Sequence, residues 1–120
     1  MSRDVSALLV DMLESIHKIE TYAAGLDEKS FGSDSRAQDA VIRRLEIIGE
    51  ASKGLPERIK TGYPHVPWKE IAGMRDVLIH SYFGVNATRV WNVVQTDLPP
   101  LKDALASSLE AESAPAKGAR

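Results

Sequence analysis

The spacing of apolar residues along the chain predicts a protein made almost entirely of α-helices. Apolar positions recur at steps of three and four residues, the spacing that places side chains on one face of an α-helix. No segment shows the alternation of apolar and polar residues typical of a half-buried β-strand. The first helix is predicted to run to about Gly25, with an apolar stripe of Val5, Leu8, Leu9, Met12, Ile16, Ile19 and Ala23. We therefore expect an all-α fold.

A second helix is predicted to begin at Ser35, because Ser35 followed by Gln38 has the pattern of a capping box. The segment KSFGSDS before it (residues 29–35) is rich in small polar residues and is expected to be a loop. The apolar stripe of this helix consists of Ala37, Val41, Leu45, Ile48 and Ala51, flanked by Ile42 and Ile47. A helix with apolar flanks is expected to be central in the fold or to face another subunit.

Prolines and glycines mark the next helix boundaries. The segment GLPERIKTGYPHVP (residues 54–67) contains three prolines and two glycines, so we expect a connection with one helical turn at residues 57–60. Pro67 suits the first position of a third helix that extends to about Ile79. Gly84 would end that helix or the turn that follows it.

The fourth helix contains two prolines, which is unusual for a helix interior. Asn86 or Thr88 is expected to cap it, and its apolar stripe consists of Val90, Val94, Leu98, Leu101, Leu105 and Leu109. Pro99 would cost about 3 kcal/mol or more in a regular helix interior. We therefore expect a kink or a restart of the helix after Asp97, next to Pro99 and Pro100.

Composition and charge are those of an ordinary globular domain, predicted to span residues 1–112, with a disordered tail over residues 113–120. The net charge of -2 argues against non-specific coating of nucleic acid but leaves room for a local basic site. The chain has no cysteine, which excludes disulfides and thiolate metal sites.

The N-terminal segment lacks the features of a secretory signal. Acidic residues at Asp4, Asp11 and Glu14 interrupt its apolar positions, and no apolar run in the chain has the length of a membrane span. We therefore expect a cytoplasmic protein without a membrane anchor.

The segment GMRDVLIHSYFG (residues 73–84) concentrates side chains suited to RNA cleavage. The guanidinium of Arg75 can grip a phosphate at two points, and the imidazole of His80 exchanges protons near neutral pH. Cleavage without a metal needs a base to deprotonate the 2′-hydroxyl, a cation to stabilise the developing charge, and an acid to protonate the leaving oxygen. Asp76 could orient His80 or pair with Arg75.

The spacing of these residues favours a dimer. Arg75 and His80 are five residues apart, which is about 140° on an ideal helix, so they do not share a face. They converge only if the helix ends or distorts between them, or if the partner of each comes from another chain. One histidine cannot easily act as acid and base at once, whereas a two-fold dimer supplies two of each residue. The alternative is structural: a histidine near a helix end often caps a carbonyl or packs half-buried, and an arginine often forms a surface ion pair.

The sequence RDVLIHSY resembles the R-x4-H-x-Y motif of the HepT toxins, a branch of the HEPN superfamily of small helical proteins. Three blocks are similar to that family in the same order: AVIRRLEIIGEASKGLP, YPHVPWKEIAGMRDVLIHSYFGV and VWNVVQTDLPPL. The resemblance covers roughly residues 5–105. It implies an up-and-down bundle of four main helices that forms a homodimer. The family often has asparagine at the position of Asp76.

The resemblance also implies roles for the motif residues. Arg75 and His80 would form a metal-independent endoribonuclease site that needs no cofactor and cuts mRNA or tRNA. Asp76 would support them, and Tyr82 would assist in the pocket and accept AMP from a cognate minimal nucleotidyltransferase antitoxin. AMP on Tyr82 would add bulk and negative charge two residues from His80 and repel RNA phosphate. Neutralisation by simple occlusion is the alternative to AMP transfer.

Two other functions remain open on the sequence alone. The first is a non-catalytic subunit that binds a nucleotide or RNA for a nucleotidyltransferase, which the acidic net charge favours. The second is a purely structural subunit in which the motif only packs a helix end. The sequence does not identify the RNA or the cleavage site.

The remaining polar and aromatic residues are interpreted as structural. Glu46 and Glu50 have no third ligand nearby and are expected to pair with Arg43 and Lys53 rather than to bind a metal. Gly49 is expected to mark a close helix crossing. Trp68 and Trp91 are expected to be core or interface anchors, and His17 and His65 lack metal-ligand spacing. Six cations are candidates for a basic rim that holds the RNA backbone: Arg43, Arg44, Lys53, Arg58, Lys60 and Arg89.

Overall fold

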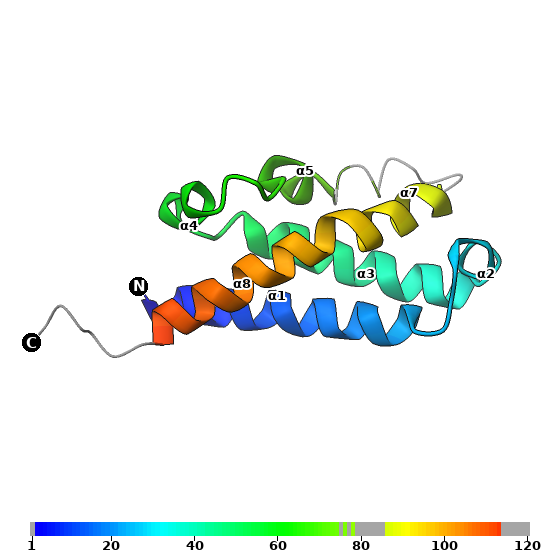
Figure 1. The fold of residues 1–120 in the computed structure, drawn as a ribbon, viewed down its shortest axis with the longest axis horizontal. Helices are drawn as coiled ribbons and strands as arrows, with labels where there is room; N and C mark the ends of the chain where they lie inside the picture. Colours follow the sequence, from blue (N-terminus) through cyan, green and yellow to red (C-terminus); the bar gives the residue numbers. More distant parts are fainter. Residues whose placement is uncertain (1, 75, 77, 79–85, 114–120) are drawn as a thin grey trace, which may run out of the picture.

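The computed structural model describes residues 2–74, 76, 78 and 86–113, and all of the secondary structure in these residues is helical (Figure 1). Its elements are α1 (Ser2–Ala23), α2 (Glu28–Gly32), α3 (Ser35–Ser52), α4 (Glu57–Gly62), α5 (Trp68–Ala72), α7 (Ala87–Asn92), the π-helical turn η1 (Val93–Asp97) and α8 (Leu98–Ser113). The predicted all-α bundle is therefore confirmed. None of the described helices is both long and apolar enough to cross a membrane.

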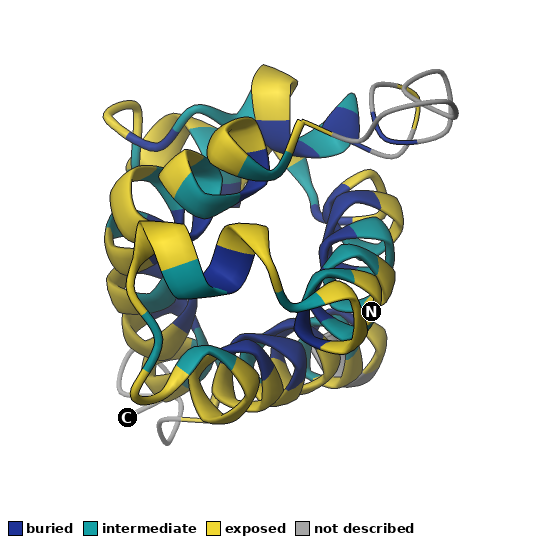
Figure 2. Ribbon diagram, turned by 90° about the vertical axis from the view of Figure 1, so that its right-hand side faces the viewer, coloured by how far each residue is buried: buried dark blue, intermediate teal, exposed yellow. Residues whose placement is uncertain are grey.

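Three long helices, α1, α3 and α8, form the main body, and the shorter helices cover it. α1 packs against both α3 and α8, while α3 also contacts α2, α5 and α7. Viewed along the long axis, the buried residues line the inside of the ring of helices (Figure 2). The helix of residues 35–52 is central in the fold, which is one of the two positions expected for it.

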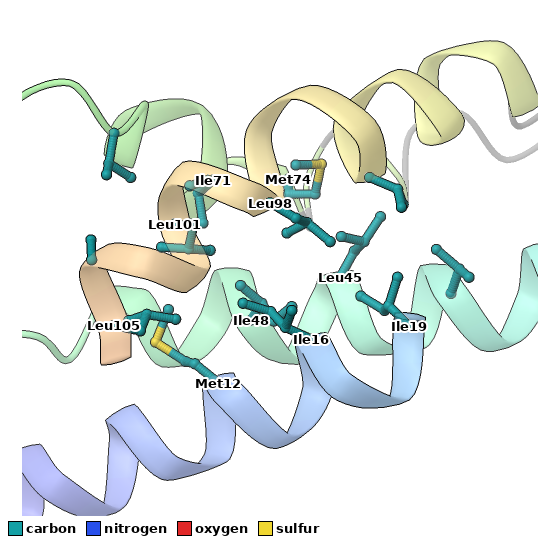
Figure 3. Close-up of a cluster of buried hydrophobic side chains, with 14 of the residues drawn as sticks. Met12, Ile16, Ile19, Leu45, Ile48, Ile71, Met74, Leu98, Leu101 and Leu105 are labelled. Atoms are coloured by element: carbon teal, nitrogen blue, oxygen red, sulfur yellow. The ribbon is translucent and has the colours of Figure 1, made fainter. Parts of the chain in front are cut away.

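The core is a continuous cluster of aliphatic side chains from all the long helices. Figure 3 shows side chains from α1, α3 and α8 converging between the helices. The fully buried members include Met12, Ile16, Ile19, Leu45, Ile48, Leu101 and Leu105. Burying each large aliphatic side chain contributes roughly 1.5–3 kcal/mol relative to leaving it exposed.

The segment before α3 is not the loop that its composition predicted, because residues 28–32 form α2. Asp27 caps this helix: its carboxylate accepts a hydrogen bond from the Ser30 amide at 2.8 Å, and the Ser30 hydroxyl accepts one from the Asp27 amide at 2.9 Å. Phe31 is fully buried and its ring lies 5.3 Å from that of Trp91. A cap and one aromatic anchor therefore outweigh the small polar residues of this segment.

The cap of α3 lies one residue earlier than predicted. The carboxylate of Asp34, not the hydroxyl of Ser35, accepts the hydrogen bond from the Ala37 amide, at 3.0 Å. Gln38 donates instead to the carbonyl of Phe31 at 2.8 Å, which ties α3 to α2.

Two further predictions, the cap of the last helical segment and the turn after α3, agree with the structure. The predicted cap of the last helical segment is confirmed for Asn86, which accepts from the Arg89 amide at 3.1 Å, whereas Thr88 lies within α7. The single turn predicted at residues 57–60 is also confirmed, as α4.

The third helix is interrupted at Gly73. Pro67 is its N-cap rather than its first residue, and α5 ends at Ala72. Gly73 follows in a turn, with its amide donating to the carbonyl of Lys69 at 3.0 Å, and Met74, Asp76 and Leu78 are helical again. Glycine is a poor residue for continuing a helix, which explains the interruption, and the described residues agree with the predicted extent towards Ile79. The helix end predicted at Gly84 lies outside the described residues.

The prolines of the last segment disturb the helix as predicted. The chain widens into η1, so that the Leu98 amide donates to the carbonyl of Val93, five residues back. α8 then begins, with Pro99 and Pro100 in its first turn, where their missing amide hydrogens cost little. α8 extends to Ser113, and residues 114–120 lie outside the described residues.

The buried hydroxyl of Ser108 in α8 allows the cost of an unpaired polar group to be measured. Its side chain is 4% exposed, and its hydroxyl has no hydrogen-bond partner among the described residues. Because a buried unpaired hydroxyl costs free energy, we expect Ser108→Ala to raise the free energy of unfolding by about 1 kcal/mol. Urea denaturation measures this change. Ser52→Ala is the matched control, since the Ser52 hydroxyl donates to the Gly49 carbonyl at 2.7 Å; a lower urea midpoint for Ser108→Ala would contradict the expectation.

Candidate functional site

Of the four predicted site residues, only Asp76 falls among the described residues. Its side chain is exposed, and it lies in a helical turn after α5. Arg75, His80 and Tyr82 lie outside the described residues, so their convergence stays a prediction. The structure instead defines the framework on either side of the motif.

On the N-terminal side, the framework depends on a close crossing between α3 and α5. A Cβ atom added at Gly49 of α3 would lie 2.7 Å from the carbonyl oxygen of Ile71 in α5. That distance is shorter than real Cβ contacts, so only glycine allows the two backbones to approach this closely. The interpretation of Gly49 as a close crossing is therefore confirmed.

Met74, the residue before Arg75, packs against the same crossing of α3 and α5. The Cβ atom of Met74 lies 3.6 Å from the position of the added Cβ at Gly49, and Met74 is buried. Leu78 is buried as well, and its spacing of four residues from Met74 is that of one helix face. Asp76 between them is exposed. The described part of the motif therefore has one face in the core and one face in solvent.

On the C-terminal side, α7 holds the chain against α2. Asn86 caps α7, Val90 is buried, and Trp91 packs on Phe31. The Thr88 hydroxyl donates to the carboxylate of Glu28 in α2 at 3.4 Å. The segment of residues 75–85 therefore connects two fixed points of the framework.

Asp97 of η1 lies close enough to Glu70 of α5 for the negative charge of Glu70 to act on it, a proximity that the sequence analysis missed. Burial raises the pKa of Asp97, and the negative charge of Glu70 raises it further. The two residues are 27 positions apart in the sequence, and no local pattern indicates that they meet.

The predicted ion pair between Arg43 and Glu46 is present, with 3.9 Å between the guanidinium and the carboxylate. Both residues, with Leu8 and Ile47, line an open groove of about 450 Å³ between α1 and α3. The described residues contain no group of three side chains that could hold a metal ion.

Arg58 does not belong to a free basic rim. Its guanidinium donates two hydrogen bonds to the carboxylate of Glu112, at 2.8 and 3.1 Å. These bonds lower the pKa of Glu112 and join α4 to the C-terminal end of α8 (Figure 1). This cation is therefore engaged in holding the fold together.

The aromatic residues act as anchors, as predicted. Trp68 is half-buried, and its indole N–H donates to the Tyr63 carbonyl at 3.0 Å. Trp91 packs against the core through Phe31. His17 and His65 are exposed, and His17 lies 3.4 Å from the carboxylate of Glu20.

The framework and the motif belong to a known class of protein. The family described as "Ribonuclease HepT-like" matches residues 12–107, a range that includes the whole of the R-x4-H-x-Y motif. This chain therefore belongs to the HepT-like ribonuclease family, and the predicted resemblance is confirmed.

Individual relatives agree with this assignment. A protein of Thermococcus cleftensis named "Probable ribonuclease HepT" is 46% identical over 102 residues, which cover 85% of this chain and 93% of that protein. A protein of Methanocaldococcus jannaschii, provisionally named as an RNase, is 43% identical over 100 residues, 83% of each chain. Another from the same organism, named as a γ-glutamylcyclotransferase and provisionally as an RNase, is 48% identical over 110 residues. This chain spans 50% of the length of that third relative. No solved structure matches the chain significantly.

Gly49→Ala tests the close crossing of α3 and α5, which lies just before the motif in the sequence. The added methyl group has to push α5 away from α3, so we expect the free energy of unfolding to fall by about 1–3 kcal/mol. Thermal or urea denaturation measures the loss. Gly32→Ala is the control, because no atom lies within 4 Å of its added Cβ. Equal stability of the Gly49→Ala variant and the unchanged protein would show that the crossing is not tight.

Asp97→Asn tests the carboxylate pair. The pKa of Asp97 is raised above 3.8 in the folded state, so its ionised form destabilises the fold at neutral pH. We expect the amide to raise the free energy of unfolding at pH 7 by about 0.5 kcal/mol. This advantage should shrink as the pH falls through the folded-state pKa towards 3.8. Denaturation across this pH range is the measurement, with Asp11→Asn, on the exposed side of α1, as the charge-matched control. An advantage that does not depend on pH would contradict the pairing.

Proposed function

We propose that this protein is a metal-independent endoribonuclease toxin of a HepT/nucleotidyltransferase toxin–antitoxin system. The observation that carries the proposal is the complete R-x4-H-x-Y motif, Arg75, His80 and Tyr82, inside the range that matches a ribonuclease family. The framework supports it, because the chain is held against α3 just before the motif and capped by Asn86 just after it.

The proposed reaction uses the imidazole of His80 and the guanidinium of Arg75. His80 takes the proton of a 2′-hydroxyl, whose oxygen attacks the neighbouring phosphorus. The 5′-oxygen leaves with a proton from a second imidazole, which gives a 2′,3′-cyclic phosphate and a 5′-hydroxyl. Arg75 stabilises the negative charge on the phosphate oxygens during this step.

A homodimer supplies the second imidazole in this proposal. A two-fold axis beside the motif would bring two copies of Arg75 and His80 to one RNA strand. Half-exposed apolar side chains on α1 and α3, among them Leu8 and Ile47, offer surface for a second protomer. RNA, mRNA or tRNA, is the proposed substrate.

Tyr82 is the proposed acceptor of AMP from a minimal nucleotidyltransferase antitoxin. The added phosphate would be attracted to Arg75 and would repel the phosphate of RNA. Asp76, exposed between the buried residues Met74 and Leu78, is proposed as the carboxylate that orients the motif side chains.

RNA cleavage by the purified dimer in EDTA tests this function. We expect Arg75→Ala and His80→Ala each to lower the cleavage rate by at least about 100-fold, because each removes a group that acts in the transition state. Arg36→Ala and His17→Ala are matched controls on exposed positions and should cleave normally. Circular dichroism and size-exclusion chromatography verify that each variant is a folded dimer.

The other outcomes separate the competing functions. Cleavage that survives both motif substitutions would contradict the assigned site. Absence of cleavage, together with RNA or nucleotide binding that depends on Arg75, would instead support a non-catalytic subunit that serves the nucleotidyltransferase. Loss of toxicity in cells on His80→Ala, with the dimer intact, would support the toxin.

A further inference from the structure

A cavity of about 400 Å³ lies between α4 and α5, on the N-terminal side of the motif. Its apolar wall includes Trp68, Pro64 and Ala72. Two lysines, Lys60 of α4 and Lys69 of α5, also line it. Figure 1 shows these two helices on the side of the bundle opposite α1. A large aromatic residue and two cations around one opening form a combination suited to nucleic acid.

The aromatic wall of the cavity is held firmly. The indole N–H of Trp68 donates to the carbonyl of Tyr63 at 3.0 Å, which fixes the orientation of the ring. Ile59 and Ile71 are buried and anchor α4 and α5 in the core. A ring that is already fixed loses little conformational entropy when a ligand stacks on it.

The two lysines are available for a ligand. Neither Lys60 nor Lys69 forms an ion pair with any of the described residues, in contrast to Arg58 on the same helix, which is bound to Glu112. Glu57 is the acidic residue of the cavity wall, so the two lysines leave its lining with a net positive charge. An anionic ligand therefore fits this opening better than a cationic one.

We infer that this cavity is a subsite for one unpaired nucleotide of a single-stranded RNA. The base stacks against Trp68, and Lys60 and Lys69 contact the phosphates on either side of it. The choice of RNA as the ligand rests on the proposed ribonuclease function. Lys60 was considered for the basic rim from the sequence, whereas Lys69 becomes a candidate only through the fold.

The subsite is close to the motif along the chain. Ala72 in the cavity wall precedes Arg75 by three residues, and three residues of chain span at most about 11 Å between Cα atoms. One RNA strand can therefore occupy the subsite and the motif together. With the RNA bound in this way, the subsite would hold a nucleotide close to the phosphodiester bond that is cut.

Binding of a fluorescent single-stranded RNA with 2′-O-methyl groups tests the subsite on the uncut complex. This RNA lacks the attacking hydroxyl, so binding is measured without cleavage, by fluorescence anisotropy at low salt. We expect Lys60→Glu and Lys69→Glu each to weaken binding at least fivefold, and Trp68→Leu about tenfold, because the aromatic face is lost. Trp68→Phe keeps an aromatic ring and should stay within about threefold of the unchanged protein.

Lys18→Glu is the matched control, since Lys18 is exposed on α1 and lies outside the cavity. The same reversal of charge at this position should change the dissociation constant less than twofold. Equal weakening by Lys18→Glu and the cavity variants would overturn the subsite, because only overall charge would then matter. If Trp68→Leu fails to fold, the two lysine variants decide the question.

Two comparisons separate this inference from the proposed function. A duplex RNA of the same sequence should bind without dependence on Trp68, because its bases are already stacked. Cleavage that depends on His80 together with binding that ignores the cavity would overturn the subsite and leave the ribonuclease intact. Binding of the 2′-O-methyl RNA that depends on the cavity, together with no cleavage of the unmodified RNA, would support the subsite and overturn the ribonuclease. No binding of single-stranded RNA would overturn the subsite.

Discussion

The position of α5 on α3 depends on the close approach of the Gly49 backbone to the Ile71 carbonyl. α5 has only five residues, too few for a stable helix on its own, so its position comes from packing on α3. The same contact holds Met74, which is the last residue before the motif. The position of Met74, directly before the motif, thus depends on the close approach of two backbones.

The second constraint is the pair of prolines near the start of α8. Without amide hydrogens, Pro99 and Pro100 cannot continue a regular helix from α7, and η1 absorbs the mismatch with one wider turn. The direction of α8 follows from this turn, and so do the packing of α8 on α1 and the burial of Leu101 and Leu105. One cost of the arrangement is that Asp97, at the end of the turn, is partly buried near Glu70.

The extent to which the fold could be predicted differs between its parts for a physical reason. Long helices such as α1 and α3 bury one face over many residues, so their period is visible in the sequence. α2 has five residues and depends on a ring contact between Phe31 and Trp91, which are 60 positions apart. The proximity of Glu70 to Asp97, 27 positions later in the sequence, is also non-local. For the candidate site, the sequence predicts which residues act, namely Arg75 and His80, but their spacing leaves the geometry open.

The packing of α8 on α1 has a consequence for synthesis of the protein on the ribosome. α1 is made first, yet its buried stripe is covered in part by α8, and Glu20 pairs with Lys102 across 82 positions of sequence. The ion pair between Arg58 and Glu112 also forms only when nearly all of the described residues have been synthesised. A nascent chain that lacks α8 leaves apolar surface of α1 uncovered, which favours chaperone binding or aggregation over folding. The fold is therefore acquired only after α8 has been synthesised, and any activity that depends on it appears only after Glu112 has left the ribosome.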